Sequence, residues 1–104
     1  MMRRGEVRWY QFSKPDKRRP VVILTRNSAL EFLGEATVAP VTRTVRDIPS
    51  EVLLTASHGV PEDCAINLDH MQTVSKSKLG GLIATLDEET MKKVSRALWF
   101  ALGF

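Results

Sequence analysis

Apolar and polar positions alternate over short distances along the chain, in a way typical of small β proteins. Residues 20–25 form a continuous apolar run, which predicts a strand buried on both faces. Pro40 lies inside a later apolar segment; because proline has no N–H for a strand ladder, we expect an edge or a bulge there. The segments predicted as strands are residues 5–12, 20–25, 36–42, 51–55, 64–68, 71–74 and 82–86.

Only short turns or helices are predicted between these strands. Residues 29–33 can form one or two helical turns before Gly34, and residues 76–81 are typical of a glycine-terminated turn. This spacing predicts a mainly β fold, a small barrel or strongly bent sheet of five to seven strands. With 104 residues, the chain has the length of one domain, spanning 1–104.

A longer helix is predicted at the C-terminal end of the sequence. Asp87 is a suitable N-cap, and Glu88 and Glu89 follow where the helix dipole favours anions. Apolar residues at helical spacing form one face of this helix, and additional aromatic residues widen it. These aromatics form either the rim of the core or a subunit interface, and we favour the interface. The apolar face consists of Met91, Val94, Leu98 and Leu102, and the additional aromatics are Trp99, Phe100 and Phe104.

Several classes of protein are not favoured by the composition. No apolar run approaches the roughly 18 residues of a membrane helix, and the charged residues after Met1 are not followed by the apolar segment of a secretory signal. Cys64 is the single cysteine, so no internal disulfide is expected. We therefore expect a cytoplasmic protein without membrane association.

The net charge of +3 is unevenly distributed. Residues 1–26 carry eight basic and two acidic side chains, and residues 27–104 carry seven basic and ten acidic ones. A basic segment on a small domain indicates a phosphate-bearing partner such as nucleic acid, although a solvated basic edge without a ligand fits the charge equally well.

The sequence offers few groups for metal or covalent chemistry. His58 and His70 stand outside any metal-ligand motif, and Gly80 and Gly81 lack the spacing and lysine of a phosphate loop. Cys64 stands at the start of an apolar strand, where a cysteine is more often a buried, inert thiol than a nucleophile. We expect no metal site and no cofactor.

The remaining arginine and threonine side chains suit RNA cleavage, because RNA supplies its own nucleophile, the 2′-OH. Arg19 stands where a basic loop meets the most apolar strand, and a guanidinium can clamp a phosphate through two N–H donors. Thr42 closes the third predicted strand and offers a hydroxyl. On the residues alone, the favoured interpretations are a surface arginine and an ordinary strand threonine.

Five segments in order resemble the MazF/PemK family of toxins, over nearly the whole chain. They are Arg-Gly-Glu at 4–6, Arg-Pro-Val-Val-Ile-Leu at 19–24, Val-Ala-Pro-Val-Thr at 38–42, Thr-Val-Ser-Lys at 73–76 with Leu79, and Leu-Asp-Glu-Glu at 86–89 with Met91 and Val94. The resemblance implies an SH3-like barrel with a C-terminal helix and a homodimer. It also implies a type II toxin that cleaves single-stranded RNA without metal, leaving 2′,3′-cyclic phosphate and 5′-OH ends, and that binds a cognate antitoxin.

The same resemblance gives roles to individual residues. Arg19 and Thr42 match the family's catalytic arginine and threonine. Thr25 and Asn27, just beyond the Arg-Pro strand, would line the same groove or else bond to nearby backbone. The other residues expected to bind RNA are Lys14, Lys17, Arg18, Arg43, His70 and Gln72.

Two departures from the family affect these roles. The basic loop at residues 13–18 is shorter than the glycine-rich loop of many members. His70 and Gln72 stand where the family commonly has glutamine and arginine, so the recognised sequence is expected to differ. His70 has three open interpretations: a specificity residue, a participant in proton transfer, or a turn residue.

Two other functions remain as alternatives. A gyrase poison of the CcdB kind shares the fold but lacks the arginine and threonine pair. A non-catalytic RNA-binding barrel would keep the basic loop without needing Thr42.

Overall fold

The computed structural model describes residues 1–12 and 18–104, so Lys14 and Lys17 lie outside the described residues. Within this part, short 3-10 turns occupy Ala56–His58, Leu68–His70 and Lys76–Lys78. The strands are β1 (Glu6–Gln11), β2 (Arg18–Ile23), β3 (Glu35–Thr42), β4 (Glu51–Leu54), β5 (Cys64–Asn67), β6 (Gln72–Ser75) and β7 (Leu79–Thr85), and the α-helices are α1 (Asn27–Leu30) and α2 (Glu88–Leu102).

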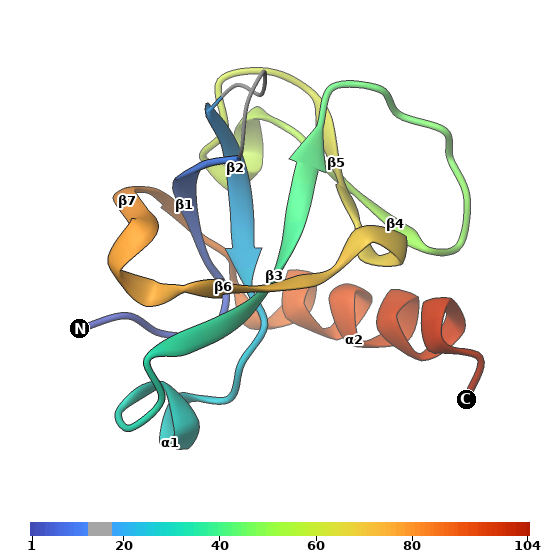
Figure 1. Ribbon diagram of the computed structural model, residues 1–104. Coiled ribbons are helices and arrows are strands. Elements are labelled where there is room, and N and C mark those ends of the chain that lie inside the picture. Colours follow the sequence, from blue (N-terminus) through green and yellow to red (C-terminus); the bar gives the residue numbers. More distant parts are fainter. Residues whose placement is uncertain (13–17) are drawn as a thin grey trace.

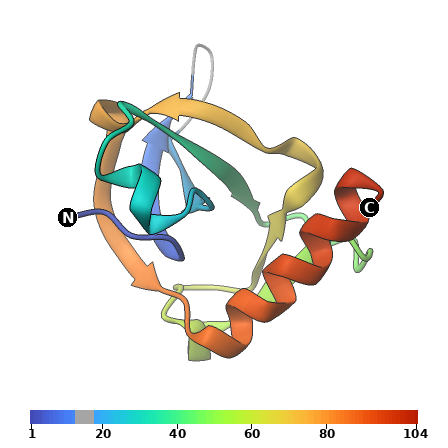
Figure 2. The same cartoon turned by 90° about the horizontal axis from the view of Figure 1, so that it is seen from below.

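The strands form one antiparallel sheet that bends round on itself. Its order is β4-β5-β3-β2-β1-β7, and β6 also pairs with β3. Seen from below, the sheet curves into a ring, and α2 runs across one side of it (Figures 1 and 2). The prediction of a small, mainly β barrel with a C-terminal helix is confirmed.

Two apolar clusters stabilise this barrel. Val21, Val22 and Ile23 in β2 are all fully buried, because their side chains alternate between the two clusters, as the continuous apolar run predicted. One cluster joins the strands to α2 through Val94 and Ala97. Since removing this contact would expose core side chains, α2 is part of the domain's core and not an appendage.

The sequence predicted an edge or a bulge at Pro40, but Pro40 lies at neither. It pairs with Val21 of β2 on one side. On its other side β3 changes neighbours, because pairing with β6 ends at Val38 and pairing with β5 begins at Val41. The missing N–H therefore falls beside a gap between two neighbouring strands, where no ladder bond is lost.

The last strand begins three residues earlier than predicted, at Leu79 instead of Leu82. Gly80 and Gly81 resemble a turn in the sequence, but they lie within β7, where the pairing with β1 shifts between Arg8 and Tyr10. The register places an extra residue on β7 there, which is a bulge. A Cβ at Gly80 would lie 3.4 Å from the Cβ of Trp9, so the glycine permits close strand contact.

Candidate functional site

A groove of about 730 Å³ opens beside the ends of β2 and β3. It brings together Arg19 and Thr42, which come from different strands. Each lies two residues beyond the paired residues Val21 and Pro40, so both stand at neighbouring ends of β2 and β3. The groove is lined by Trp9, Arg18, Arg19, Pro20, Val41, Thr42, Arg43, Thr44, Val60, Pro61, Glu62, Cys64, Leu82 and Ile83.

Arg19 has a fixed backbone and an exposed side chain. Its backbone pairs with Tyr10 of β1, and Pro20 after it restricts it to extended geometry. Among the described residues, the Arg19 guanidinium has no hydrogen-bond or ion-pair partner. An arginine held this way keeps all five N–H donors available for an anion in the groove.

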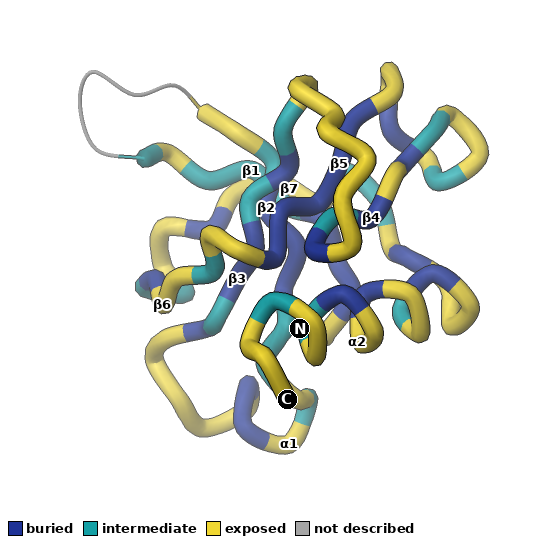
Figure 3. The backbone as a smooth tube through the Cα atoms, turned by 90° about the vertical axis from the view of Figure 1, so that its right-hand side faces the viewer, coloured by how far each residue is buried: buried dark blue, intermediate teal, exposed yellow. Residues whose placement is uncertain are grey.

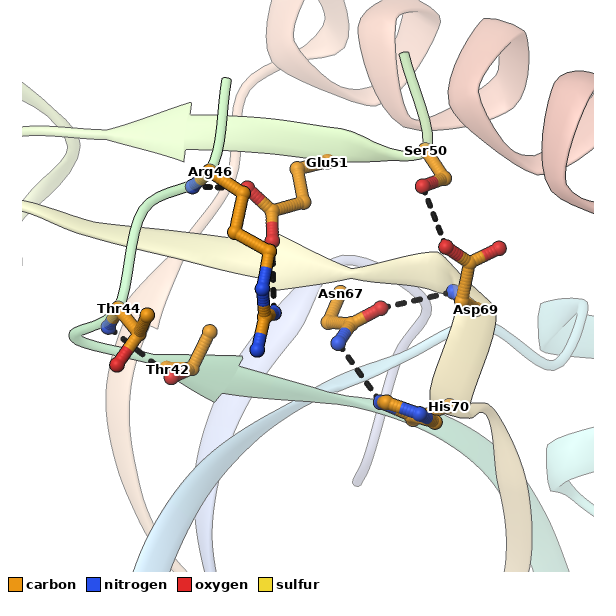
Figure 4. A network of polar contacts seen from close by, with 8 residues as sticks. All are labelled: Thr42, Thr44, Arg46, Ser50, Glu51, Asn67, Asp69 and His70. Carbon is orange, nitrogen blue, oxygen red and sulfur yellow. Dashed lines mark hydrogen bonds and ion pairs between the residues drawn. The ribbon is translucent and has the colours of Figure 1, made fainter. Parts of the chain in front are cut away.

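Thr42 has its hydroxyl oriented by the loop that follows β3. The backbone N–H of Thr44 donates to Thr42 Oγ1 over 3.1 Å (Figure 4). Because the oxygen accepts this bond, the hydroxyl hydrogen remains free to donate. The half-buried Thr42 thus offers a positioned donor in the same groove as the Arg19 guanidinium.

The groove carries more positive than negative charge. The Arg18 guanidinium lies 4.7 Å from the centre of the Trp9 ring, which holds it by a cation–π contact. Arg43 Nε lies 3.0 Å from Glu62 Oε1, with both side chains largely exposed. Three arginines therefore face one carboxylate among the lining residues, a balance that attracts a polyanion.

Thr25 and Asn27 lie outside the groove lining, contrary to the expectation that they share it. Thr25 Oγ1 accepts from the backbone N–H of Thr37 over 2.7 Å. Asn27 Oδ1 accepts from the backbone N–H of Arg4, also over 2.7 Å. Both side chains bond to nearby backbone, of β3 and of the N-terminal segment, which is the second interpretation that the sequence left open.

His70 and Gln72 are both exposed and also lie outside the groove lining. His70 ends the 3-10 turn after β5, and Gln72 begins β6, where it pairs with Val38 of β3. Figure 4 shows the His70 ring beside Asn67, along the same strand β3 that ends at Thr42. Both residues therefore belong to a second surface, farther along β3.

Cys64 lines the groove but is buried. Burial, reinforced by the neighbouring Asp63 and Glu62 carboxylates, raises the pKa of its thiol. The thiol is therefore protonated at neutral pH, which is the inert form.

Comparison with known proteins places the chain in a family. Residues 3–102 match the family described as PemK-like and MazF-like toxins of type II toxin–antitoxin systems. The chain belongs to this toxin family. The match spans all seven strands and the whole of α2.

Two curated relatives of this MazF/PemK-family chain are named endoribonucleases. Probable endoribonuclease MazF5 of Mycobacterium tuberculosis is 39% identical over 100 residues, covering 95% of this chain and 91% of the relative. Endoribonuclease EndoA of Bacillus subtilis is 32% identical over 88 residues, covering 82% of this chain and 76% of the relative.

Solved structures of the family share the fold. The Mycobacterium tuberculosis toxin MazF-mt6 aligns with a TM-score of 0.87 at 32% identity, over 95% of this chain and 97% of that one. A mycobacterial endoribonuclease, solved in complex with its cognate antitoxin, aligns with a TM-score of 0.89 at 26% identity, over 100% and 97% of the two chains. These alignments confirm the MazF-like barrel with its C-terminal helix.

Sequence reasoning missed the opposite wall of the groove. Trp9 and Leu82 belong to β1 and β7, which the bending of the sheet brings round toward β3. Trp9 looked like an ordinary strand aromatic, and Leu82 like the first residue of a strand. The available signal was a tryptophan in the strand that leads into the basic loop, because aromatic side chains near basic residues are a common setting for base stacking.

The described residues include neither a cluster of metal-binding side chains nor a membrane-spanning helix. They contain no group of three or more His, Cys, Asp or Glu side chains placed to hold a metal ion. No helix among them is long and apolar enough to cross a membrane.

Proposed function

We propose that this MazF/PemK-family chain is a metal-independent endoribonuclease toxin that cuts single-stranded RNA in the groove between Arg19 and Thr42. The observation that carries the proposal is the meeting of these two side chains, from separate strands, in a groove with surplus positive charge. A gyrase poison or a simple RNA-binding barrel needs no such pair.

The reaction uses a nucleophile that RNA supplies. The 2′-oxygen attacks the adjacent phosphorus, a new P–O bond closes the 2′,3′-cyclic phosphate, and the bond to the 5′-oxygen breaks. The 2′-OH loses its proton, and the leaving 5′-oxygen gains one to become a 5′-OH. Negative charge grows on the non-bridging oxygens during this step, and that charge is what the protein must stabilise.

Arg19 and Thr42 have separate roles in this scheme. The Arg19 guanidinium clamps the scissile phosphate and stabilises its growing charge; it does not act as a base, because arginine stays protonated in proteins. The Thr42 hydroxyl, already oriented by the Thr44 N–H, donates to a non-bridging oxygen or to the leaving group. Preorganised donors of this kind lower a reaction barrier without reorganising during the step.

The flanking basic residues hold the RNA strand on either side of the cut. Arg18 on Trp9 forms a flat surface on which a base can stack, and Arg43 can exchange Glu62 for a phosphate because exposed ion pairs are weak. We extend the RNA contacts to Lys14 and Lys17 of the basic loop and to His70 and Gln72 beyond Thr42.

Two protein partners belong to the proposal. A cognate antitoxin with an acidic segment would occupy the basic groove and exclude RNA, as complementary charge favours. A second copy of this chain would cover the exposed aromatic end of α2, where Trp99 and Phe100 are each 59% exposed (Figure 3).

Substitutions at the pair test the proposal directly. We expect Arg19→Ala and Thr42→Val each to lower the rate of RNA cleavage by about 100- to 1000-fold, the usual cost of losing one transition-state donor. Rates would be measured under single-turnover conditions with a fluorescent RNA containing the preferred cut site.

Matched variants separate chemistry from folding. Thr42→Ser keeps the hydroxyl and is expected to retain most of the cleavage rate. Arg19→Lys keeps the charge but loses the two-pronged donor, so its cleavage rate is expected to lie between those of the wild type and Arg19→Ala. Full activity of Thr42→Val, with circular dichroism and melting temperature unchanged, would remove the Thr42 hydroxyl from the mechanism.

A further inference from the structure

Asn67 has an amide whose orientation is fixed by a backbone group. Asn67 is buried, and its Oδ1 accepts from the backbone N–H of Asp69 over 2.9 Å. A backbone N–H can only donate, so the amide oxygen must face it. The Asn67 Nδ2 group, which can only donate, is therefore the atom that faces His70.

This orientation settles which nitrogen of His70 carries the proton. Asn67 Nδ2 lies 2.8 Å from His70 Nδ1. Because Nδ2 is a donor, Nδ1 must accept, and the neutral ring then carries its proton on Nε2. Among the described residues Nε2 has no hydrogen-bond partner, and His70 is exposed, so the ring offers a single N–H donor to an incoming ligand.

The turn that carries His70 is held in place from a second direction. Ser50 Oγ donates to Asp69 Oδ2 over 2.6 Å, and the Leu68 N–H donates to the backbone oxygen of Ser50 over 3.0 Å. Ser50 is only 2% exposed. Figure 4 shows Ser50, Asp69, Asn67 and His70 as one connected chain of contacts. An exposed ring supported by buried partners is the arrangement expected of a recognition group, not of a freely rotating surface histidine.

His70 lies within reach of an RNA strand that occupies the groove. Thr42 pairs with Ala65 of β5, and Asn67, two residues along β5, begins the contacts to His70. At the ordinary rise of a strand, two residues cover about 7 Å. A short extended piece of RNA leaving the cut site can therefore reach the His70 ring.

We propose that Asn67 is a positioning residue that fixes His70 as an Nε2–H donor, and that this donor selects an RNA base presenting a hydrogen-bond acceptor next to the cut site. The inference rests on the proposed ribonuclease function. It adds to that function one recognition residue with a defined proton position, and a buried residue that determines it.

The tautomer can be measured without RNA. Long-range nitrogen–proton NMR spectra of the full chain, at a pH where both rings are neutral, distinguish Nε2–H from Nδ1–H. The sequence has two histidines, and His58 is an internal control: its Nδ1 accepts from the Thr55 N–H over 2.9 Å. We expect the Nε2–H pattern for both rings, and an Nδ1–H pattern for His70 would overturn the proposal.

Asn67→Asp is designed to invert the tautomer. A carboxylate at this position still accepts from the Asp69 N–H, but it also accepts from the ring. At a pH where the ring is neutral, the His70 proton should therefore move to Nδ1 and Nε2 should become an acceptor. The His58 spectrum should not change. Base preferences at each position of the cut site, read by sequencing products from a random RNA pool, should then change at one position only.

The size of the change is that of one hydrogen bond, about 2- to 10-fold in preference for the selected base. His70→Phe keeps an exposed ring without nitrogen and should lose the same preference; because the ring is exposed, this variant tests the proposal even where Asn67→Asp does not fold. In the His70→Phe background, Asn67→Asp should have no further effect on preference, as expected when one residue acts through the other.

The outcomes separate this inference from the proposed function. Unchanged base preferences in His70→Phe, with Arg19→Ala still inactive, would overturn the role of His70 and leave the ribonuclease intact. A folded wild-type chain that cuts no RNA would instead overturn the proposed function and this inference with it.

Discussion

The side chains of the groove are held by different kinds of contact, which suits different tasks. Thr42 Oγ1 is fixed by a backbone N–H, while Arg18 packs on a ring and Arg43 pairs with Glu62. Arg19 alone among the three groove arginines has no partner within the described residues. The groove therefore combines a fixed donor with an uncommitted cation, the combination that phosphate binding at the cut site requires.

Cys64 is a buried thiol in the wall of the same groove. Because burial raises the pKa of its thiol, we expect Cys64 in the folded chain to react with iodoacetamide more slowly than free cysteine at pH 7.5, where a lower thiolate fraction limits the rate. Mass spectrometry of the labelled protein measures this rate, and the unfolded chain in urea serves as the control.

The same thiol should be dispensable for RNA cleavage. Cys64→Ala is expected to retain cleavage, with a modest loss of stability because the side chain packs in the larger apolar cluster. Rapid alkylation of the folded chain, or loss of cleavage in a folded Cys64→Ala variant, would contradict the assignment of an inert thiol.

The sequence predicted one wall of the groove and not the other. Arg19 and Thr42 stand at the ends of strands that their composition identifies, so their proximity needed only that β2 and β3 pair. Trp9 and Leu82 join them because the sheet curls, and curvature depends on long-range packing that local patterns do not encode. The donor state of His70 likewise depends on Asn67, whose buried amide has no distinctive sequence signal.

Among the secondary-structure elements, local composition was sufficient to predict a strand where its pairing is regular. Residues 20–23 of β2 form an unbroken apolar run, and Val21, Val22 and Ile23 among them are fully buried. β7 departs from this pattern, because two shifts in its pairing with β1 introduce bulges near Gly80 and Ile83. Glycines within a bulged strand resemble a turn in sequence, so the start of β7 was predicted three residues late.

The N-terminus of α2 was predicted correctly, and its cap gives a pH-dependent prediction. Asp87 accepts from the backbone N–H of Thr90 over 2.8 Å, and hydrogen bonds from Thr90 hold the pKa of the carboxyl below its ordinary value. A lowered pKa in the folded chain means that the ionised cap stabilises the fold above the unfolded pKa. This contribution is lost as pH falls through the folded pKa.

Asp87→Asn provides the matched comparison, since asparagine also caps a helix but does not titrate. We expect the difference in melting temperature between wild type and Asp87→Asn to favour wild type at pH 7 and to shrink toward pH 2. Thermal melts followed by circular dichroism across this range measure it. A difference that does not depend on pH would show that the carboxylate charge contributes nothing to the cap.

At the scale of the whole molecule, two surfaces stand out. One is the basic groove, and the other is the C-terminal end of α2, where Phe104 is 83% exposed and packs edge-on against Trp99 at 5.6 Å between ring centres. A shallower hollow beside Phe100 adds Leu53 of β4 to this apolar surface. Apolar area of this kind is unfavourable in water, which supports our proposal that a second copy covers it.

A charge placed on that surface should separate the copies. Phe100→Glu is expected to convert the proposed homodimer to a monomer in sedimentation-velocity measurements at micromolar concentration, because a carboxylate would be buried without a partner. Phe32→Glu is the matched control: Phe32 is 82% exposed near α1, away from α2, and its replacement should leave the dimer intact. A dimer that persists in Phe100→Glu would place the interface elsewhere.

In the proposed function, the groove cleaves RNA with groups supplied by the chain and by the RNA itself. The most direct test incubates purified, folded, antitoxin-free protein with a long RNA of mixed sequence in EDTA and maps the product ends, with Arg19→Ala beside it. We expect discrete cuts with 5′-OH and 2′,3′-cyclic phosphate ends that disappear in Arg19→Ala. Intact RNA, cuts that require a divalent metal, or equal cutting by Arg19→Ala would contradict it.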